Sequence, residues 1–133
     1  MSTTRLISSL GQTALYGSLA SNSIGRITTS GVVTNYTGSG ISSPEGITSG
    51  PDGALWFTND GNGSIGRITT GGVVTNYTGT GILGRTSINV GPDGALWFTN
   101  LANDSIGRIT TSGVVTNYTG SHDQRSLRHN HRT

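Results

Sequence analysis

The chain has 133 residues, enough for one ordinary domain, and contains no cysteine, which excludes disulfides and thiolate metal sites. All eight basic residues are arginines, and up to Gly120 five arginines balance five acids, so the net charge of +2 belongs to the last thirteen residues. A neutral repeat region argues against nucleic acid as a partner. No apolar run could span a membrane, and no signal-peptide core is found, so we expect a cytoplasmic protein without a membrane partner.

An internal repeat organises the sequence. The stretch PDGALWFTN occupies residues 51–59 and returns, letter for letter, at residues 92–100. The rest of the unit, SIGRITT followed by GVVTNYTG, begins at Ser23, Ser64 and Ser105. A constant period of about 41 residues indicates a repeat architecture in which neighbouring units share a core.

Each unit reads as four short strands separated by turns. In the unit that begins at Ile41, turn residues such as Gly50, Pro51, Asp52 and Gly53 separate segments rich in β-branched and aromatic residues. We predict strands at residues 46–48, 54–58, 64–69 and 73–78. The second of these carries bulky residues on both faces, so we expect both of its faces to be buried.

Four antiparallel strands in about 40 residues are typical of a β-propeller blade. We therefore predict an all-β fold, an incomplete propeller that forms an open arc of about three blades. The expected divisions are a degenerate or out-of-frame first blade at 1–22, the second half of that blade at 23–40, whole blades at 41–81 and 82–120, and a disordered tail at 121–133.

The two ends depart from the repeat, and frame errors in the gene would account for both. Suitable codons for residues 10–18 (LGQTALYGS), together with the first two bases of the Leu19 codon, also encode GPDGALWFT when they are read in a shifted frame. Codons for residues 124–133, followed by a stop codon and one further C, likewise encode SGPSGITTGPD, which resembles residues 42–52. We therefore hypothesise frameshifts near residues 19 and 121, with out-of-frame translation beyond them.

The residues from Ile24 to Gly120 resemble the streptogramin lyase family, typified by virginiamycin B lyase. The resemblance rests on the pattern GITxGPDGxLWFTxxxxxxIGRITxxGxVTxYT, which reads GITSGPDGALWFTNDGNGSIGRITTGGVVTNYT at residues 46–78. It implies a seven-bladed propeller, magnesium as cofactor, and an elimination that opens streptogramin B antibiotics, which are cyclic depsipeptides, at their ester bond. The family carries this reaction on histidine and glutamate at one mouth of the channel, and it implies a role in antibiotic resistance.

The sequence offers no catalytic residue that matches this expectation. His122, His129 and His131 are its only histidines, and all lie in the tail. A metal site at His129 and His131 would need more ligands on rigid structure, so we identify no metal ligand. Glu45, the only glutamate, is the candidate for substrate binding, because the next unit has Thr86 there; a solvated loop acid is the alternative.

We therefore expect a lyase-family fragment that is inactive on its own, and the alternative is a non-catalytic propeller scaffold for binding or interaction. Residues that recur in every unit are given a structural role, because one reaction at one site has no use for repeated copies. Open blade faces predict self-association, since their buried aromatic residues need a neighbour. The residues given a structural role are Arg26, Arg67 and Arg108, Asp52 and Asp93, and Trp56 and Trp97.

Overall fold

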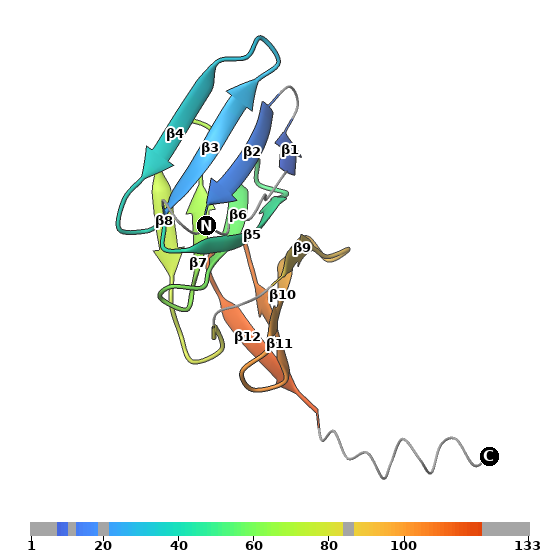
Figure 1. The fold of residues 1–133 in the computed structure, drawn as a ribbon. Coiled ribbons are helices and arrows are strands. Elements are labelled where there is room, and N and C mark those ends of the chain that lie inside the picture. The colour runs from blue at the N-terminus through green and yellow to red at the C-terminus, as the bar shows by residue number, and fades with distance from the viewer. Residues whose placement is uncertain (1–7, 11–12, 19–21, 84–86, 121–133) are drawn as a thin grey trace, which may run out of the picture.

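The computed structural model describes residues 8–10, 13–18, 22–83 and 87–120, with the backbone alone for residues up to 18. These residues form twelve strands in three four-stranded antiparallel sheets, each built from four consecutive strands (Figure 1). The prediction of all-β blades in an open arc is confirmed.

The first blade contains β1 (Ser8–Leu10), β2 (Thr13–Ser18), β3 (Ser23–Thr28) and β4 (Val33–Thr37). The second contains β5 (Pro44–Ser49), β6 (Leu55–Asn59), β7 (Ser64–Ile68) and β8 (Val74–Tyr77). The third contains β9 (Ile88–Val90), β10 (Leu96–Asn100), β11 (Ser105–Ile109) and β12 (Val115–Thr119).

Strand register repeats with the sequence. Trp56 lies opposite Arg67 between β6 and β7, and Trp97 lies opposite Arg108 between β10 and β11. In the first blade Leu15 lies opposite Arg26, so β2 and β3 pair in the same register although residues 10–18 lack the repeat letters. This backbone arrangement is compatible with either reading frame, and the frame hypothesis stays a prediction.

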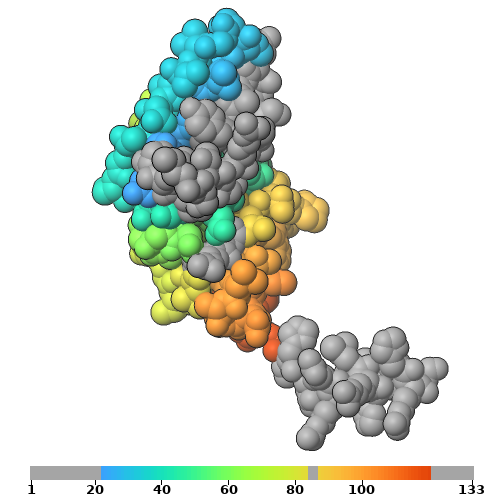
Figure 2. Space-filling view, in the orientation of Figure 1, coloured from blue at the N-terminus to red at the C-terminus, as the bar shows by residue number. Residues whose placement is uncertain are grey.

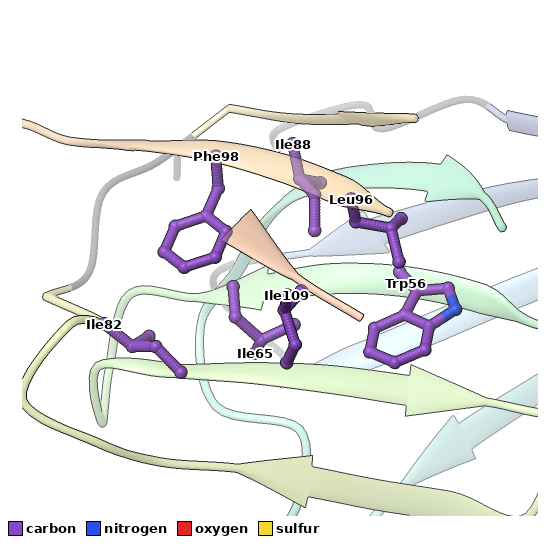
Figure 3. Packing of buried hydrophobic residues seen from close by; sticks show 7 residues of the cluster. All are labelled: Trp56, Ile65, Ile82, Ile88, Leu96, Phe98 and Ile109. Carbon is purple, nitrogen blue, oxygen red and sulfur yellow. The ribbon is translucent and has the colours of Figure 1, made fainter. Parts of the chain in front are cut away.

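The hydrophobic core lies between blades. One cluster joins the second blade to the third and contains Trp56, Ile65, Ile82, Ile88, Leu96, Phe98 and Ile109 (Figure 3). The cluster between the first and second blades contains Ile24, Ile41, Leu55, Phe57 and Ile68, which are the counterparts, one repeat earlier, of Ile65, Ile82, Leu96, Phe98 and Ile109. The second blade therefore packs Trp56 and Ile65 against the third blade, and Leu55, Phe57 and Ile68 against the first blade. All of β6 is buried, as its two-faced composition predicts.

Two glycine positions are fixed by this packing. Gly66 lies opposite Phe57 in the register, and a Cβ on Gly66 would collide with the Phe57 ring. In the turn before β6, Gly53 has φ +80° and donates its N–H to the Gly50 carbonyl over 3.3 Å. The predicted Pro-Asp-Gly turn is therefore confirmed, because a φ in this range favours glycine.

Several predicted strand ends are wrong. The first strand of the second blade begins at Pro44 rather than at residue 46, so Glu45 lies inside β5 and does not precede it. Asn59, expected in a turn, is the buried last residue of β6. The predicted ends at Thr69 and Thr78 overrun β7 and β8 by one residue each.

The tail at 121–133 and Thr86 lie outside the described residues. No helix that is long and apolar enough to cross a lipid bilayer occurs in the described part of the chain.

Candidate functional site

The candidate site lies at the end of the blades where one blade is linked to the next. The inner strand β5 contacts the inner strands β1 and β9 of the flanking blades, so these three strands line the inside of the arc. Glu45 is the second residue of β5, beside a bulge between Pro44 and Ile47. Its Oε2 atom is buried and has no hydrogen-bond partner, which is costly for a carboxylate oxygen.

A buried asparagine holds the linker in place beside Glu45. The side chain of Asn59 accepts a hydrogen bond from the Ser42 N–H at 2.9 Å and donates to the Gly40 carbonyl at 2.9 Å. It also donates to Ser64 Oγ at 3.0 Å, which ties the linker to β7. Asn100 makes the corresponding bonds to Leu83, Gly81 and Ser105 in the next repeat. The linker end is therefore built the same way in both complete blades.

A cavity of about 740 Å³ opens at this same end between the second and third blades. Its apolar walls come from the linker, at Ile82 and Leu83, and from the β10–β11 turn, at Leu101 and Ala102. Asp60 and Asn62 of the β6–β7 turn add polar groups. The Asp60 N–H donates to the Ser43 carbonyl at 3.0 Å, which places this turn beside the start of β5.

The size and lining of the cavity fit a small organic ligand. Pockets of about 300–1,000 Å³ with mostly apolar walls and a few polar groups are typical of small-molecule sites. Leu101 is 69% exposed and Leu83 is 38% exposed, so two large apolar side chains face solvent at the rim. A ligand with apolar side chains would cover both.

The repeated Asp, Trp and Arg residues form a structural unit at the opposite end of each sheet. Asp52 Oδ2 accepts from Arg67 Nε at 2.7 Å, while Oδ1 accepts from Trp56 Nε1 at 3.1 Å and from the Ala54 N–H at 3.3 Å. The Trp56 ring stacks on Tyr77 with the ring centroids 5.3 Å apart, and the Arg67 guanidinium lies over the same ring. The structural role predicted for these residues is confirmed in the second blade. Arg67 pairs with Asp52 within its own blade.

These contacts control the acidity of the turn carboxylates. Partial burial by itself raises the pKa of Asp52, but the hydrogen bonds from Arg67, Trp56 and Ala54 outweigh it and leave the pKa below its ordinary value. In the third blade the hydrogen bonds from Trp97 and Arg108 lower the pKa of Asp93 to about 2. Both carboxylates are therefore ionised at neutral pH and committed to structure.

The residues that the family's chemistry requires are not brought together in the described part of the chain. His122, His129 and His131 lie outside it. No three His, Cys, Asp or Glu side chains of the described residues lie close enough to hold a metal ion. Glu45 of β5 and Asp60 of the β6–β7 turn are the carboxylates at the linker end of the second blade, and magnesium in proteins takes octahedral oxygen ligands from one or two carboxylates, waters and substrate. The described residues do not by themselves form a magnesium site.

Comparison with known proteins identifies the family. The family model described as the virginiamycin B lyase family matches residues 2–125. The chain belongs to the virginiamycin B lyase family. Among solved structures, virginiamycin B lyase from Staphylococcus aureus shares 40% identity and a TM-score of 0.77 over 83% of this chain and 38% of its own. A streptogramin B lyase shares 37% identity and a TM-score of 0.81 over 88% of this chain and 40% of its own.

A further match of the same kind includes a ligand. A catalytically inactive variant of the Staphylococcus aureus virginiamycin B lyase, solved with quinupristin, shares 38% identity and a TM-score of 0.81 over 87% of this chain and 41% of its own. The chain thus spans about two fifths of the length of the family structures it matches. A search of curated protein sequences found no match.

Sequence reasoning singled out Glu45 but missed the cavity and the role of Asn59. Residues that line the cavity, such as Leu83 and Leu101, lie in a linker and a turn. Sequence patterns do not predict ligand contacts at such positions. Asn59 was hidden because it adjoins the turn residues of 60–63, although its recurrence as Asn100 was a signal that it serves the blade.

Proposed function

We propose that this chain is a segment of a streptogramin-lyase-type propeller that binds a cyclic depsipeptide at its linker end without opening the ring by itself. The observation that carries the proposal is the combination of a 740 Å³ cavity at that end with a sequence whose three histidines all lie in residues 122–131. The family supplies the substrate class.

The lining suits such a ligand. A cyclic depsipeptide presents apolar side chains together with amide N–H groups and ester and amide carbonyls. The side chains of Leu83 and Leu101 would pack against its apolar groups, and burial of apolar surface is the main favourable term in such binding. The side-chain N–H groups of Asn62 would donate to carbonyl oxygens of the ring, since Asn62 Oδ1 already accepts from Ser64.

The same residues explain why we expect no turnover. Ring opening by elimination breaks the bond between the ester oxygen and its alkyl carbon, and a base removes a proton from the carbon next to that alkyl carbon. The products are a carboxylate and a carbon–carbon double bond. A histidine is the side chain most often suited to such proton transfer at neutral pH. The described residues contain no histidine, because His122, His129 and His131 lie outside them.

Quinupristin is the probe for this proposal. Titration calorimetry should detect binding to the purified chain, and Leu101→Ser should weaken it by at least several-fold, whereas Val73→Ser, at a side chain that is 64% exposed and outside the cavity lining, should not. Chromatography with mass spectrometry, with magnesium added, should show no linear product. Elimination gives an isomer of unchanged mass, while hydrolysis adds one water. Absence of binding would refute the proposal, and an isomer at the mass of the intact ring would show that the chain is a lyase.

The alternative is a non-catalytic scaffold, and one observation favours it. Arg67 forms an ion pair with Asp52, and Arg108 forms one with Asp93. Each pair lies within one blade, so these repeated charges stabilise the blade. A chain of this kind could serve as an interaction surface and bind no antibiotic. Failure of quinupristin to bind to a folded chain would support this reading.

A further inference from the structure

The β6–β7 turn and the β10–β11 turn hold corresponding asparagines in the same way. Asn62 and its counterpart Asn103 are both exposed, and each accepts a hydrogen bond at Oδ1 from a serine hydroxyl at 2.5 Å. Gly63 follows Asn62 with φ +61°, and Asp104 follows Asn103 with φ +52°. The two amides therefore have similar surroundings, but the residue that follows them differs in chemistry.

The main-chain nitrogen of the following residue is the group that can attack an asparagine amide. Glycine has no Cβ, so its nitrogen can approach the side-chain Cγ closely. An aspartate at this position adds a Cβ, and its carboxylate opposes the loss of the N–H proton that the attack requires. Asn62 is the only asparagine of the 133 residues that precedes a glycine. The sequence and the turn together make it the most reactive amide of the chain.

We propose that Asn62 is a site of spontaneous deamidation. The Gly63 nitrogen attacks Asn62 Cγ and gives its proton to water, and the side-chain nitrogen takes up protons from water and leaves as ammonia. The product is a cyclic succinimide, which one water molecule opens at either carbonyl to give aspartate or isoaspartate. In sum, one amide and one water become one carboxylic acid and one ammonia. The Ser64 hydroxyl donates to Oδ1 and would stabilise the negative charge that develops on this oxygen during the attack.

The modified residue lies in the lining of the cavity between the second and third blades. Figure 2 shows the green segment, near residue 60, at the molecular surface above the yellow segment, near residue 80. Aspartate at this position would add a second carboxylate to a lining that already contains Asp60. Isoaspartate would also route the main chain through the side-chain carbons, which lengthens the turn next to Ser64 and its hydrogen bond from Asn59 at 3.0 Å.

Peptide mapping of the full chain after incubation in mildly alkaline buffer tests the proposal. Trypsin cleaves after arginine, so Asn62 falls in the peptide 27–67 and Asn103 in the peptide 86–108. Fragmentation in the mass spectrometer should place the conversion of amide to acid at Asn62. Asn103 is the internal control and should stay unmodified over the same period. An unmodified Asn62, or equal conversion at both asparagines, would overturn the proposal.

Exchange of the two following residues separates the effect of glycine from that of the turn. Gly63→Asp should slow the conversion of Asn62 at least several-fold, and Asp104→Gly should start conversion at Asn103. Both variants are expected to fold, because Asp104 already adopts a positive φ and glycine adopts it freely. Circular dichroism checks that each variant keeps its strands. Conversion that stays at Asn62 in both variants would overturn the mechanism, because the glycine would then not select the residue.

The effect on the cavity is measured with Asn62→Asp, which reproduces the aspartate product. Only this effect rests on the proposed function, because Asn62 is there a donor to carbonyl oxygens of the ligand. Titration calorimetry with quinupristin should show at least several-fold weaker binding than to the wild type. If the wild type does not bind quinupristin, the proposed function fails, while the peptide map still decides the modification. Equal binding by both proteins would show that a charge at residue 62 does not regulate the cavity.

Discussion

Arg67 and Asp52 stand fifteen residues apart in the sequence and are joined by an ion pair of 2.7 Å between Nε and Oδ2. The pair connects β7 to the turn that precedes β6, and the other oxygen of the same carboxylate holds the Trp56 indole and the Ala54 N–H. The carboxylate thus fixes the orientation of the ring that fills the space between blades. Arg108, Asp93 and Trp97 repeat the arrangement in the third blade.

Removal of the charge at this turn should destabilise the blade. Asp52→Asn keeps an acceptor for Trp56 and Ala54 but loses the charged bond from Arg67, and we expect the free energy of unfolding to fall by about 1–2 kcal/mol. Urea unfolding followed by tryptophan fluorescence measures it. Asp104→Asn is the matched control, because Asp104 is an exposed turn residue with φ +52°, which asparagine also adopts. Equal losses in both variants would contradict this role for Asp52.

Acid should weaken the fold over a defined interval. The pKa of Asp93 is lowered from 3.8 to about 2 in the folded chain, and that of Asp52 is lowered too. A group with a depressed pKa in the folded state contributes stability above its unfolded pKa and loses it as the pH falls through the folded pKa. The urea midpoint should therefore decrease between about pH 4 and pH 2. In the double variant Asp52→Asn, Asp93→Asn this decrease should be smaller, and an unchanged pH profile would refute the assignment.

The glycine opposite Phe57 should be intolerant of any side chain. Gly66→Ala places a Cβ into the Phe57 ring, and overpacking of this kind costs about 1–3 kcal/mol. Gly79→Ala is the control, since a Cβ there meets nothing within 4 Å and Gly79 does not have a positive φ. Thermal unfolding of both variants measures the difference. A stable Gly66→Ala protein would mean that the ring can move aside.

Loss of the buried amide at Asn59 should loosen the linker end. Asn59→Ala leaves the Ser42 N–H without its acceptor and removes a donor to Ser64, and we expect a loss of about 1–3 kcal/mol. Asn35→Ala, at an exposed position in β4, is expected to change stability by less than about 0.5 kcal/mol. Hydrogen exchange should show faster exchange at residues 40–43 in Asn59→Ala. Exchange spread evenly over the chain would argue for a general loss of packing instead.

The frame hypothesis is tested by reading the gene. If it holds, the nucleotides for residues 10–19 will spell GPDGALWFT in a shifted frame, and those that start in the codon for residue 124 and run through the stop codon into the following base will spell SGPSGITTGPD. Codons that spell neither stretch in any frame would end the hypothesis. The DNA decides the question because the strand register of β2 accommodates the residues present.

Much of the fold was accessible from local sequence. The alternation of β-branched residues with Pro, Asp and Gly marks strands and turns, because backbone preferences act over a few residues. The exceptions have long-range causes: Asn59 is drawn into the strand by the linker at Gly40 and Ser42, which is far away in sequence. Glu45 was singled out as a difference between repeats, but the buried, unpaired state of its oxygen depends on strands of other blades.

The sequence by itself determined the blade, the period at which it recurs and the residues that fill the spaces between blades, because identical letters carry identical local preferences. Only the tertiary structure decided how deeply each copy of a repeated residue is buried. Ile65 is buried and Ile106 is exposed with the same neighbours in sequence, since burial depends on whether another blade lies against the sheet. The cavity at the linker end follows for the same reason, because its walls come from two successive blades.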